Sequence, residues 1–288
     1  MVTDMKKLPC VSLCLLAAAC LAAAECRKNT NAYVSPTERG EPFLLKNGLT
    51  NYVVTWRYTN PSPTQPGRVL VGMPAPVNTT GFSRKDFTSI VLNGIDSRVL
   101  EPKKFEMFNT EETSGVDIHY NFDGVPMIQR FAVSDASPLL SMTWRRGAGK
   151  PMRPIESLSI RFTVLPCASG RARDSYSREV VTPAGKYLPK GKARWRKRKL
   201  SARDTFLILQ DAKYQSGQQS PNAGPVVLCP GWKSILSGMV MFGVHQDLYV
   251  NFELDPKAES WSFGLLDSEA KRSNAEFAAF LKELKLVP

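Results

Sequence analysis

The stretch Asp247–Asp255, which reads DLYVNFELD, predicts a β-strand with one buried face. Apolar side chains occupy every second position, which is the side-chain period of a strand. These positions are Leu248, Val250, Phe252 and Leu254. Pro256 ends the strand, because proline has no amide proton to donate to a neighbouring strand. The next apolar run, Trp261–Leu266, is short, and its spacing suits an antiparallel neighbour of this strand.

Short runs with strand character recur along most of the chain. They are Tyr52–Tyr58, Val69–Met73, Phe87–Leu92, Val116–Asp123, Met127–Val133, Leu139–Trp144, Leu158–Val164, Thr205–Leu209, Pro225–Cys229 and Gly238–Val244. One run ends at Asn93–Gly94, a pair suited to a tight hairpin turn because both residues tolerate positive φ. With about a dozen such runs, the sequence predicts an all-β fold, a predominantly antiparallel β-sandwich.

The end of the chain changes from the period of a strand to that of a helix. Ser273 and Glu276 form a capping box, in which each side chain satisfies a free amide of the other residue. The apolar residues Phe277, Phe280, Leu281 and Leu284 then fall on one helical face. We expect a C-terminal amphipathic helix at residues 274–286. A single apolar stripe usually faces the protein's own core, so we favour docking on the sheet over binding to a partner.

Residues 1–24 have the composition of an export signal. Lys6 and Lys7 precede an uncharged apolar run, Leu8–Ala19, and Ala22–Ala24 offers the small residues that signal peptidase needs. The apolar run is too short for a comfortable transmembrane helix. We therefore expect a protein that is secreted, periplasmic or attached to the cell envelope.

Cys20 offers an alternative form of attachment, a lipid anchor. Small residues precede this cysteine, as they do in bacterial lipoprotein signals. However, Ala17 stands where a branched aliphatic residue is usual. The expected contact with a membrane is limited to this anchor.

The cysteine content argues against a disulfide scaffold. Three of the six cysteines lie in the predicted signal, and Cys26, Cys167 and Cys229 remain after export. They are too few and too far apart for a stapled small fold or a zinc cluster, so we expect no metal and no cofactor. Cys167 and Cys229 either form a disulfide or act as small buried apolar residues.

The positive charge of the chain is concentrated in one segment. Residues 171–203 contain 12 lysines and arginines against two acidic residues, which gives +10 of the total net charge of +12. We expect residues 25–49 to form a leader, and residues 50–288 a β-sandwich domain with a basic loop insertion at residues 167–203. Like charges repel one another, which favours a solvated loop.

This basic segment contains the candidate residues for binding a polyanion. They are Lys190, Lys192, Arg194, Trp195, Arg196, Lys197, Arg198 and Lys199. A nucleic acid is not the expected partner of an exported protein, although the composition alone would suit one. An anionic polymer of the cell envelope is a second interpretation, and a solvated loop without a partner is the third.

The sequence carries no recognisable catalytic motif. His119 and His245 are its two histidines, and neither lies in an HExxH or Gly-x-Ser-x-Gly context. No glycine-rich phosphate loop follows a predicted strand. We therefore predict no catalytic residue.

Polar and aromatic residues provide candidates for ligand binding. Asp117, His119 and Asn121 project from one face of a predicted strand, where neighbouring pairs are able to contact a cation or a sugar hydroxyl. The simpler interpretation is the polar face of a half-buried strand. His245 lies at a strand entrance. Trp232, in a predicted loop, and Trp144 are candidate platforms for stacking on a sugar.

Three functional hypotheses follow. The leading one is an exported β-sandwich that binds a polymer, most plausibly a glycan, without catalysis. The second is a carbohydrate-active enzyme, a polysaccharide lyase or glycoside hydrolase, which requires carboxylates converging in a cleft. The third is a structural protein of the cell envelope.

The predicted export signal is directly testable. We expect the mature protein to begin near Glu25, or at a modified Cys20, because the apolar run and its alanine-rich exit precede these residues. N-terminal sequencing of the protein purified from its native host measures this. Recovery of an intact Met1 or Met5 would refute the prediction.

Overall fold

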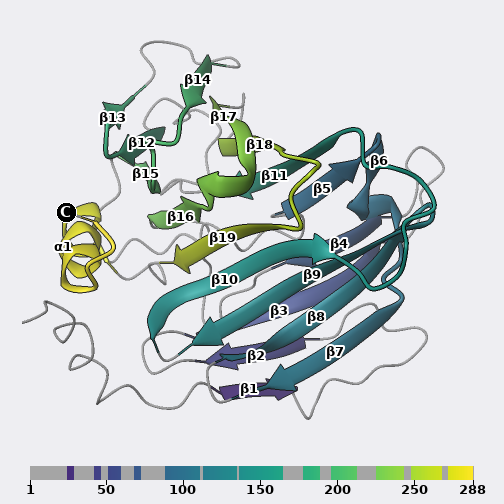
Figure 1. The fold of residues 1–288 in the computed structure, drawn as a ribbon. Helices are drawn as coiled ribbons and strands as arrows, with labels where there is room; N and C mark the ends of the chain where they lie inside the picture. Colours follow the sequence, from purple (N-terminus) through teal and green to yellow (C-terminus); the bar gives the residue numbers. More distant parts are fainter. Residues whose placement is uncertain are drawn as a thin grey trace, which may run out of the picture.

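The structure is a computed structural model, and in its described part the chain is mostly antiparallel β-sheet (Figure 1). It describes residues 25–28, 42–46, 51–59, 68–72, 88–110, 113–134, 136–164, 178–188, 196–212, 225–242, 248–267 and 272–287. The strands are β1 (Glu25–Lys28), β2 (Pro42–Lys46), β3 (Asn51–Thr59), β4 (Arg68–Gly72), β5 (Thr88–Leu92), β6 (Ile95–Asp96), β7 (Lys104–Asn109), β8 (Thr113–Phe122), β9 (Val125–Ser134), β10 (Ser137–Arg146), β11 (Leu158–Val164), β12 (Arg178–Thr182), β13 (Gly185–Tyr187), β14 (Arg196–Leu200), β15 (Leu207–Asp211), β16 (Val226–Pro230), β17 (Ile235–Phe242), β18 (Leu248–Leu254) and β19 (Ser260–Asp267). One α-helix, α1 (Asn274–Glu283), follows them.

These strands form three sheets. The largest has nine strands in the order β13-β12-β15-β16-β19-β10-β9-β8-β7, and the second has six in the order β14-β17-β18-β11-β5-β6. A four-stranded sheet, β1 to β4, lies behind β7 to β10 in Figure 1. Buried residues from all three sheets meet in one apolar core, and a second apolar cluster lies between the nine-stranded sheet and helix α1. The predicted all-β sandwich with a C-terminal helix is therefore confirmed.

Strand β18 has the alternating burial that its sequence predicts. Leu248, Val250 and Phe252 are fully buried and Leu254 is nearly so, whereas the residues between them are half-buried or exposed. The strand pairs antiparallel with β11 on one side and with β17 on the other. It is thus an interior strand of the six-stranded sheet.

Strand β19 does not lie beside β18, contrary to the expectation from its spacing. It enters the nine-stranded sheet, where it pairs with β10 and β16. The turn after Leu254 therefore carries the chain from one sheet to the other. The rings of Phe252 and Phe263 then face each other across the core, with their centroids 5.4 Å apart. Burial of both aromatic rings favours this crossover over a hairpin.

The hairpin at Asn93–Gly94 forms as predicted. Asn93 has a φ of 47° and Gly94 a φ of 83°, both in the left-handed region. The Asn93 side chain accepts hydrogen bonds from the backbone amides of Glu156 and Ser157. This turn holds β6 and its Asp96 at the edge of the six-stranded sheet.

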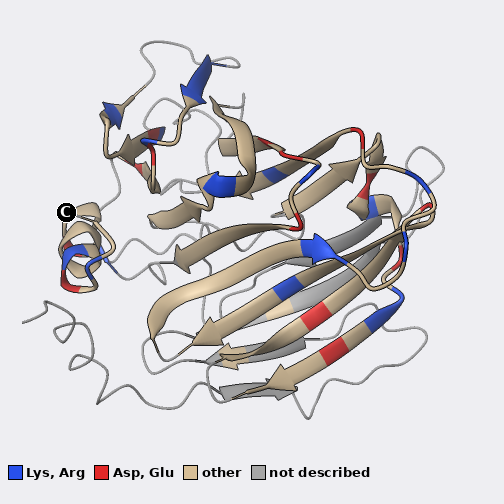
Figure 2. Ribbon diagram, viewed as in Figure 1, with Lys and Arg blue, Asp and Glu red and all other residues tan. Residues whose placement is uncertain are grey.

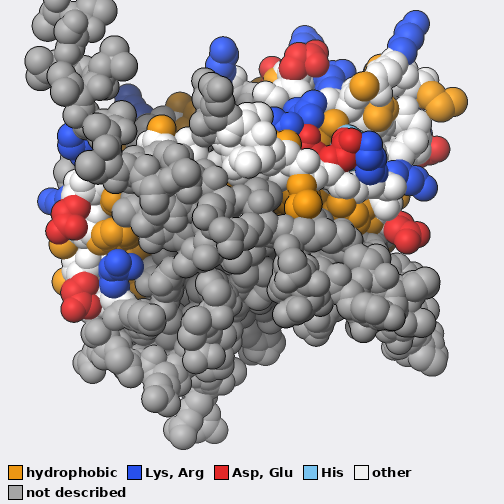
Figure 3. Space-filling view, turned by 90° about the horizontal axis from the view of Figure 1, so that it is seen from below, with side chains coloured by type: hydrophobic (Ala, Val, Ile, Leu, Met, Phe, Trp, Pro, Cys, Tyr) orange, Lys and Arg blue, Asp and Glu red, His pale blue; other side chains and the backbone are white. Residues whose placement is uncertain are grey.

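Helix α1 begins with the predicted capping box. The Ser273 hydroxyl accepts from the Glu276 amide at 3.2 Å, and the Glu276 carboxylate accepts from the Ser273 amide at 2.6 Å. Phe277 and Leu281 are fully buried in an apolar cluster that includes Val227 of β16. The helix therefore docks on the outer face of the nine-stranded sheet. Figure 3 shows charged and apolar side chains mixed at the left, the end of the molecule where the helix lies.

The predicted basic loop insertion is wrong for the described part of residues 167–203. This part contains β12, β13 and β14, and β14 carries the sequence RKRKL as an edge strand paired with β17. An edge strand leaves every second side chain in solvent and so accommodates lysines without burying their charge. Charge content alone therefore did not distinguish a loop from an edge strand.

The predicted export signal and Cys20 lie outside the described residues. Within the described residues, no helix combines the length and the apolar character that crossing a membrane requires.

The inward position of Phe252 leads to a prediction about stability. Replacing Phe252 with Ala should lower the free energy of unfolding by about 3–5 kcal/mol, because a fully buried ring is lost from a packed core. Chemical denaturation measures the change. As a control, Glu253→Ala, on the exposed side of the same strand, should cost about 1 kcal/mol or less. Similar losses for the two variants would show that the faces of β18 are assigned wrongly.

Candidate functional site

The outer face of the six-stranded sheet carries an ordered array of polar side chains. Strand pairing places Arg161 of β11 opposite Asn251 of β18, and Ser159 opposite Glu253. It also places Ser89 of β5 beside Arg161. Because the alternate residues of these strands are buried, these side chains all point away from the core.

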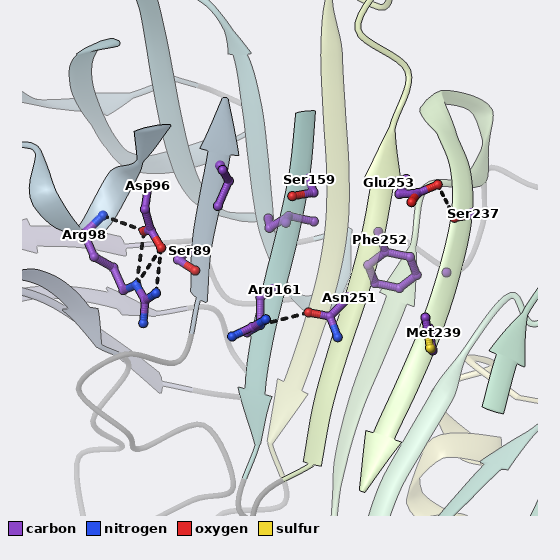
Figure 4. A pocket seen from close by; sticks show the side chains of 13 residues that line it. Ser89, Asp96, Arg98, Ser159, Arg161, Ser237, Met239, Asn251, Phe252 and Glu253 are labelled. Carbon is purple, nitrogen blue, oxygen red and sulfur yellow. Dashed lines mark hydrogen bonds and ion pairs between the residues drawn. The ribbon is translucent and has the colours of Figure 1, made fainter. Parts of the chain in front are cut away.

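This face is hollowed into a pocket of about 270 Å³. Figure 4 shows the side chains around it, which come from five strands and the turn after β6. The polar lining residues are Ser89, Asp96, Arg98, Ser159, Arg161, Ser237, Asn251 and Glu253. The pocket thus combines hydroxyl, amide, guanidinium and carboxylate groups.

Arg161 and Asn251 form the centre of the array. The Arg161 Nε donates to the Asn251 Oδ1 at 2.9 Å, and the guanidinium lies 5.6 Å from the centroid of the Tyr249 ring. The bond fixes the orientation of the amide, because its oxygen faces Arg161. The Asn251 Nδ2 is buried and has no hydrogen-bond partner. A buried donor without an acceptor is costly, so the Asn251 amide has one unmet hydrogen-bonding requirement.

Glu253 is oriented by a neighbour on β17, which lies on the other side of β18 from β11. Its Oε2 accepts from the Ser237 hydroxyl at 2.8 Å. A shift of register between Ile235 and Ser237 on β17 brings this serine opposite Glu253. The carboxylate therefore leans toward β17 and away from β11.

Asp96 lies at the other end of the pocket. Its carboxylate accepts from the Arg98 amide at 2.9 Å and pairs with the Arg98 guanidinium at 2.6 Å. Register joins Glu253, Ser159, Val91 and Asp96 in one row across four strands. With strands about 4.8 Å apart, the backbones of Glu253 and Asp96 are separated by roughly 14 Å. Figure 4 shows the two carboxylates held by partners at opposite sides.

Glycoside hydrolases act through two carboxyl groups that flank the bond to be cleaved. Inverting and retaining enzymes hold their carboxyl groups about 5–9.5 Å apart. In this pocket each carboxylate turns toward its own hydrogen-bond donor and away from the other.

The structure divides the predicted polyanion-binding residues between the two sides of β14. Lys197 and Lys199 are exposed and pair in register with Met241 and Met239 on the same outer face as the pocket. Arg198 points to the opposite side, where it binds the Thr182 hydroxyl at 3.0 Å. Arg196 begins the strand and is exposed. Lys190, Lys192, Arg194 and Trp195 lie outside the described residues.

Arg198 has a structural role. Its guanidinium lies 5.7 Å from the Tyr187 ring centroid and 3.6 Å from the Asp204 carboxylate. This side chain is only 18% exposed. We therefore correct its assignment as a polyanion-binding residue.

Asp117, His119 and Asn121 share one face of β8, as predicted, but this face belongs to the nine-stranded sheet. Figure 2 shows acidic bands on β7 and β8 next to basic bands on β9 and β10. Arg130 binds Asp117 through two hydrogen bonds of 2.7 Å, and Arg145 adds one of 3.0 Å. The carboxylate is thus occupied by two guanidiniums and is not available to a cation.

The pKa of Asp117 reflects these contacts. Burial opposes its ionisation, but the hydrogen bonds and charges of Arg130 and Arg145 outweigh burial and hold the pKa of this carboxyl below its usual range. The Arg130 guanidinium also lies 4.2 Å from the centroid of the Phe108 ring. Asp117 therefore joins β8, β9 and β10 on their outer side.

His119 and Asn121 are also engaged by neighbours. The His119 Nε2 lies 2.7 Å from the Glu106 carboxylate on β7. Asn121 accepts from the Gly124 amide at 2.6 Å and so stabilises the turn after β8. These contacts favour the interpretation of a polar strand face over that of a ligand site. His245, the remaining histidine, lies outside the described residues.

The tryptophans predicted to stack on a sugar belong to the core or pack against it. Trp144 is 1% exposed, so its ring is not accessible to a ligand. Trp232 is half-buried, and it packs edge-on against Phe252 while its Nε1 donates to the Asp204 carbonyl at 2.9 Å. The assignment of Trp144 is therefore corrected, because burial of its large ring contributes to the core, whereas the assignment of Trp232 stays a prediction.

A second, open pocket of about 450 Å³ lies on the outer face of the nine-stranded sheet. Arg130 lines one part of it, Ser141 and Ser262 contribute small side chains, and Gly264 contributes backbone. Cys229 also lines it as a free thiol, and burial raises the pKa of this thiol to about 11. The interpretation of Cys229 as a small, partly buried apolar residue therefore holds.

The central residues of the first pocket were not among the sequence-based candidates. Asn251 and Glu253 are the polar half of the stretch DLYVNFELD, so the alternation already placed them on the outer face. Arg161 lies 90 residues away from Asn251 in sequence. Only the pairing of β11 with β18 brings it beside Asn251.

Comparison with known proteins gives weak similarities of fold. No protein-family model matches the chain, and no curated protein matches its sequence. An α-N-acetylgalactosaminidase from Bifidobacterium bifidum aligns over 87% of this chain and 39% of its own, with 10% identity and a TM-score of 0.46. An α-galactosidase from Lactobacillus brevis covers 83% and 40%, with 6% identity and a TM-score of 0.44.

A shorter solved structure aligns over nearly its full length. A galactose mutarotase-like protein from Clostridium acetobutylicum covers 85% of this chain and 98% of its own, with 8% identity and a TM-score of 0.41. The chain thus spans about two fifths of the length of the two glycosidases. Similarities at this level do not identify a ligand.

The ion pairs of Asp117 lead to a prediction about pH. Replacing Asp117 with Asn should lower the free energy of unfolding near neutral pH by about 1–3 kcal/mol. This is less than for a fully buried pair, because Arg130 and Arg145 are 36% and 38% exposed and therefore screened by solvent. The pKa of Asp117 is lower in the folded state than in the unfolded state. Its ion pairs therefore contribute their full stabilisation above a pH of about 4, and this stabilisation is lost as the pH falls further.

Chemical denaturation between pH of about 2 and 7 tests this prediction. Stability of the wild type should fall more steeply below pH of about 4 than that of Asp117→Asn. Asp123→Asn is the matched control, because its ion pair with Arg153 is exposed and should contribute little. Parallel pH profiles of the wild type and Asp117→Asn would contradict the assigned role.

Proposed function

We propose that this protein is exported and binds a glycan, without catalysis, on the outer face of the six-stranded sheet. The glycan occupies the pocket around Arg161 and Asn251. Its hydroxyl oxygens accept from the Asn251 amide, and its hydroxyl protons are donated to the Glu253 carboxylate.

The observation that carries this proposal is the buried Asn251 Nδ2 without a partner. Arg161 holds the other atom of the amide at 2.9 Å, so the amide does not rotate freely to satisfy its own donor. Occupation of the site by a ligand oxygen would remove the cost of this buried donor. Sugars supply hydroxyl groups that both donate and accept, which matches the mixed donors and acceptors of the pocket.

The shape of the face supports an extended ligand. The pocket is floored by a sheet, and rows of outward side chains continue past it onto β14. A flat, open array of this kind accommodates a chain of sugar units better than one enclosed small molecule, which usually occupies a deeper cavity. Tyr249, beside Arg161, adds an aromatic surface next to the polar groups.

The decisive variant is Asn251→Asp. It keeps an oxygen facing Arg161 but replaces the Nδ2 donor with a second oxygen, so the fold should be retained while the ligand contact is lost. We expect affinity for the bound glycan to fall at least tenfold, the effect of losing one hydrogen bond and leaving an unpaired oxygen. Isothermal titration calorimetry against a panel of soluble oligosaccharides measures this.

The control is Thr143→Ala, an outer-face change on β10 of the nine-stranded sheet that removes a hydroxyl. It should bind as the wild type does. Absence of binding to every oligosaccharide in the panel would refute glycan binding. Binding that is unchanged in Asn251→Asp would place the glycan elsewhere on the molecule. Release of reducing ends during incubation with a bound polysaccharide would favour the enzyme alternative.

A further inference from the structure

The outer face of the six-stranded sheet holds three cationic side chains that have no acidic partner among the described residues. They are Lys197 and Lys199 on β14 and Arg161 on β11. The interactions of Arg161 are its hydrogen bond to Asn251 and its contact with the Tyr249 ring. Elsewhere in the described part of the chain, Arg98, Arg130 and Arg145 form ion pairs with acidic residues.

The register of the sheet aligns these cations with the pocket. Lys199 pairs with Met239, Met239 with Asn251, and Asn251 with Arg161. With strands about 4.8 Å apart, Lys199 and Arg161 stand roughly 14 Å apart on either side of the pocket centre. Lys197 lies in the next row, beside Met241. A ligand that occupies the pocket and extends toward β14 therefore meets positive charge at both ends.

The charges on this face do not balance. Asp96 and Arg98 neutralise each other in one ion pair. Glu253 is the remaining acid that lines the pocket, and a serine, not a cation, binds it. Among the described residues, one carboxylate therefore faces three cations, so this part of the face has a net positive charge.

We propose that the glycan is acidic and that Lys197, Lys199 and Arg161 bind its carboxylate or sulfate groups. This proposal rests on the proposed function, because it names the ligand class of the same site. Arg161 presents a planar guanidinium suited to an oxyanion, and the two lysines act as mobile point charges along the edge strand. Asn251 and Glu253 then bind the hydroxyl groups of the same sugar units.

A different role for the two lysines makes an opposite prediction. Lysines on an edge strand prevent pairing with the edge of another molecule. If this were their whole role, their removal would promote association of the protein and leave binding of an acidic glycan unchanged. The two roles are therefore separable by experiment.

The experiment compares two matched pairs of ligands with the full chain. One pair is oligogalacturonate and the same oligosaccharide with its carboxyl groups reduced, and the other is dextran sulfate and dextran. Affinity is measured by calorimetry at low and at physiological ionic strength. We expect at least one acidic ligand to bind about tenfold or more tightly than its neutral counterpart, with the difference shrinking as salt increases. The preferred pair distinguishes a carboxylate ligand from a sulfate ligand.

The variant Lys197→Gln/Lys199→Gln tests which residues are responsible. It should weaken binding of the acidic ligand roughly fivefold to tenfold and leave the neutral ligand unaffected. The control is Lys103→Gln/Lys150→Gln, which removes the same charge from two exposed lysines that do not lie on the six-stranded sheet. It should bind as the wild type does at physiological ionic strength. Circular dichroism and the melting temperature confirm that both variants are folded.

The outcomes separate this inference from the proposed function. Equal binding of acidic and neutral oligosaccharides would overturn the inference and leave glycan binding intact. Equal loss in the two double variants would show that only total charge matters, and would also overturn it. Binding to vesicles that contain phosphatidylglycerol, but to neither acidic polysaccharide, would assign the cations to lipid headgroups. Failure to bind any of these ligands would contradict the proposed function itself.

Discussion

Phe252 packs against Phe263 across the core, and this contact determines the direction of every other side chain on β18. Because successive residues of a strand point to opposite faces, burial of Phe252 requires Asn251 and Glu253 to face outward. The pairing of β18 with β11 and β17 then sets which side chains stand beside them. The candidate site is thus a consequence of core packing, since a slip of one residue would exchange its polar groups for apolar ones.

The basic segment follows the same rule of alternation. In β14 the lysines at positions 197 and 199 face solvent on the side of the pocket, whereas Arg198 faces Tyr187 and Asp204. Two of these like charges thus remain in solvent, and the third lies near the Asp204 carboxylate. This arrangement makes a strand compatible with the basic sequence. The same division gives the outer face its excess of positive charge.

Much of the fold was predictable from sequence, because strand period, turn residues and the capping box are local features. The burial of Trp144 was also predictable from sequence, because Leu140 and Met142 share its alternation and this pattern indicates a buried face. The pocket was less predictable. Arg161 and Asn251 are 90 residues apart, and Ser237 reaches Glu253 only through a shift of register. Pairing between distant strands is not encoded in any local pattern.

The position of β19 between β10 and β16 has a consequence for the order of folding. Thr143 and Ser262, which are hydrogen-bonded across β10 and β19, lie 119 residues apart. A chain that emerges from the ribosome therefore presents β7 to β10 long before the strand that completes their sheet exists. Contacts between such distant residues slow folding and leave apolar strands unpaired in the meantime. The edge of β10 that β19 covers in the finished sheet therefore stays without its partner strand until the last part of the chain has been synthesised.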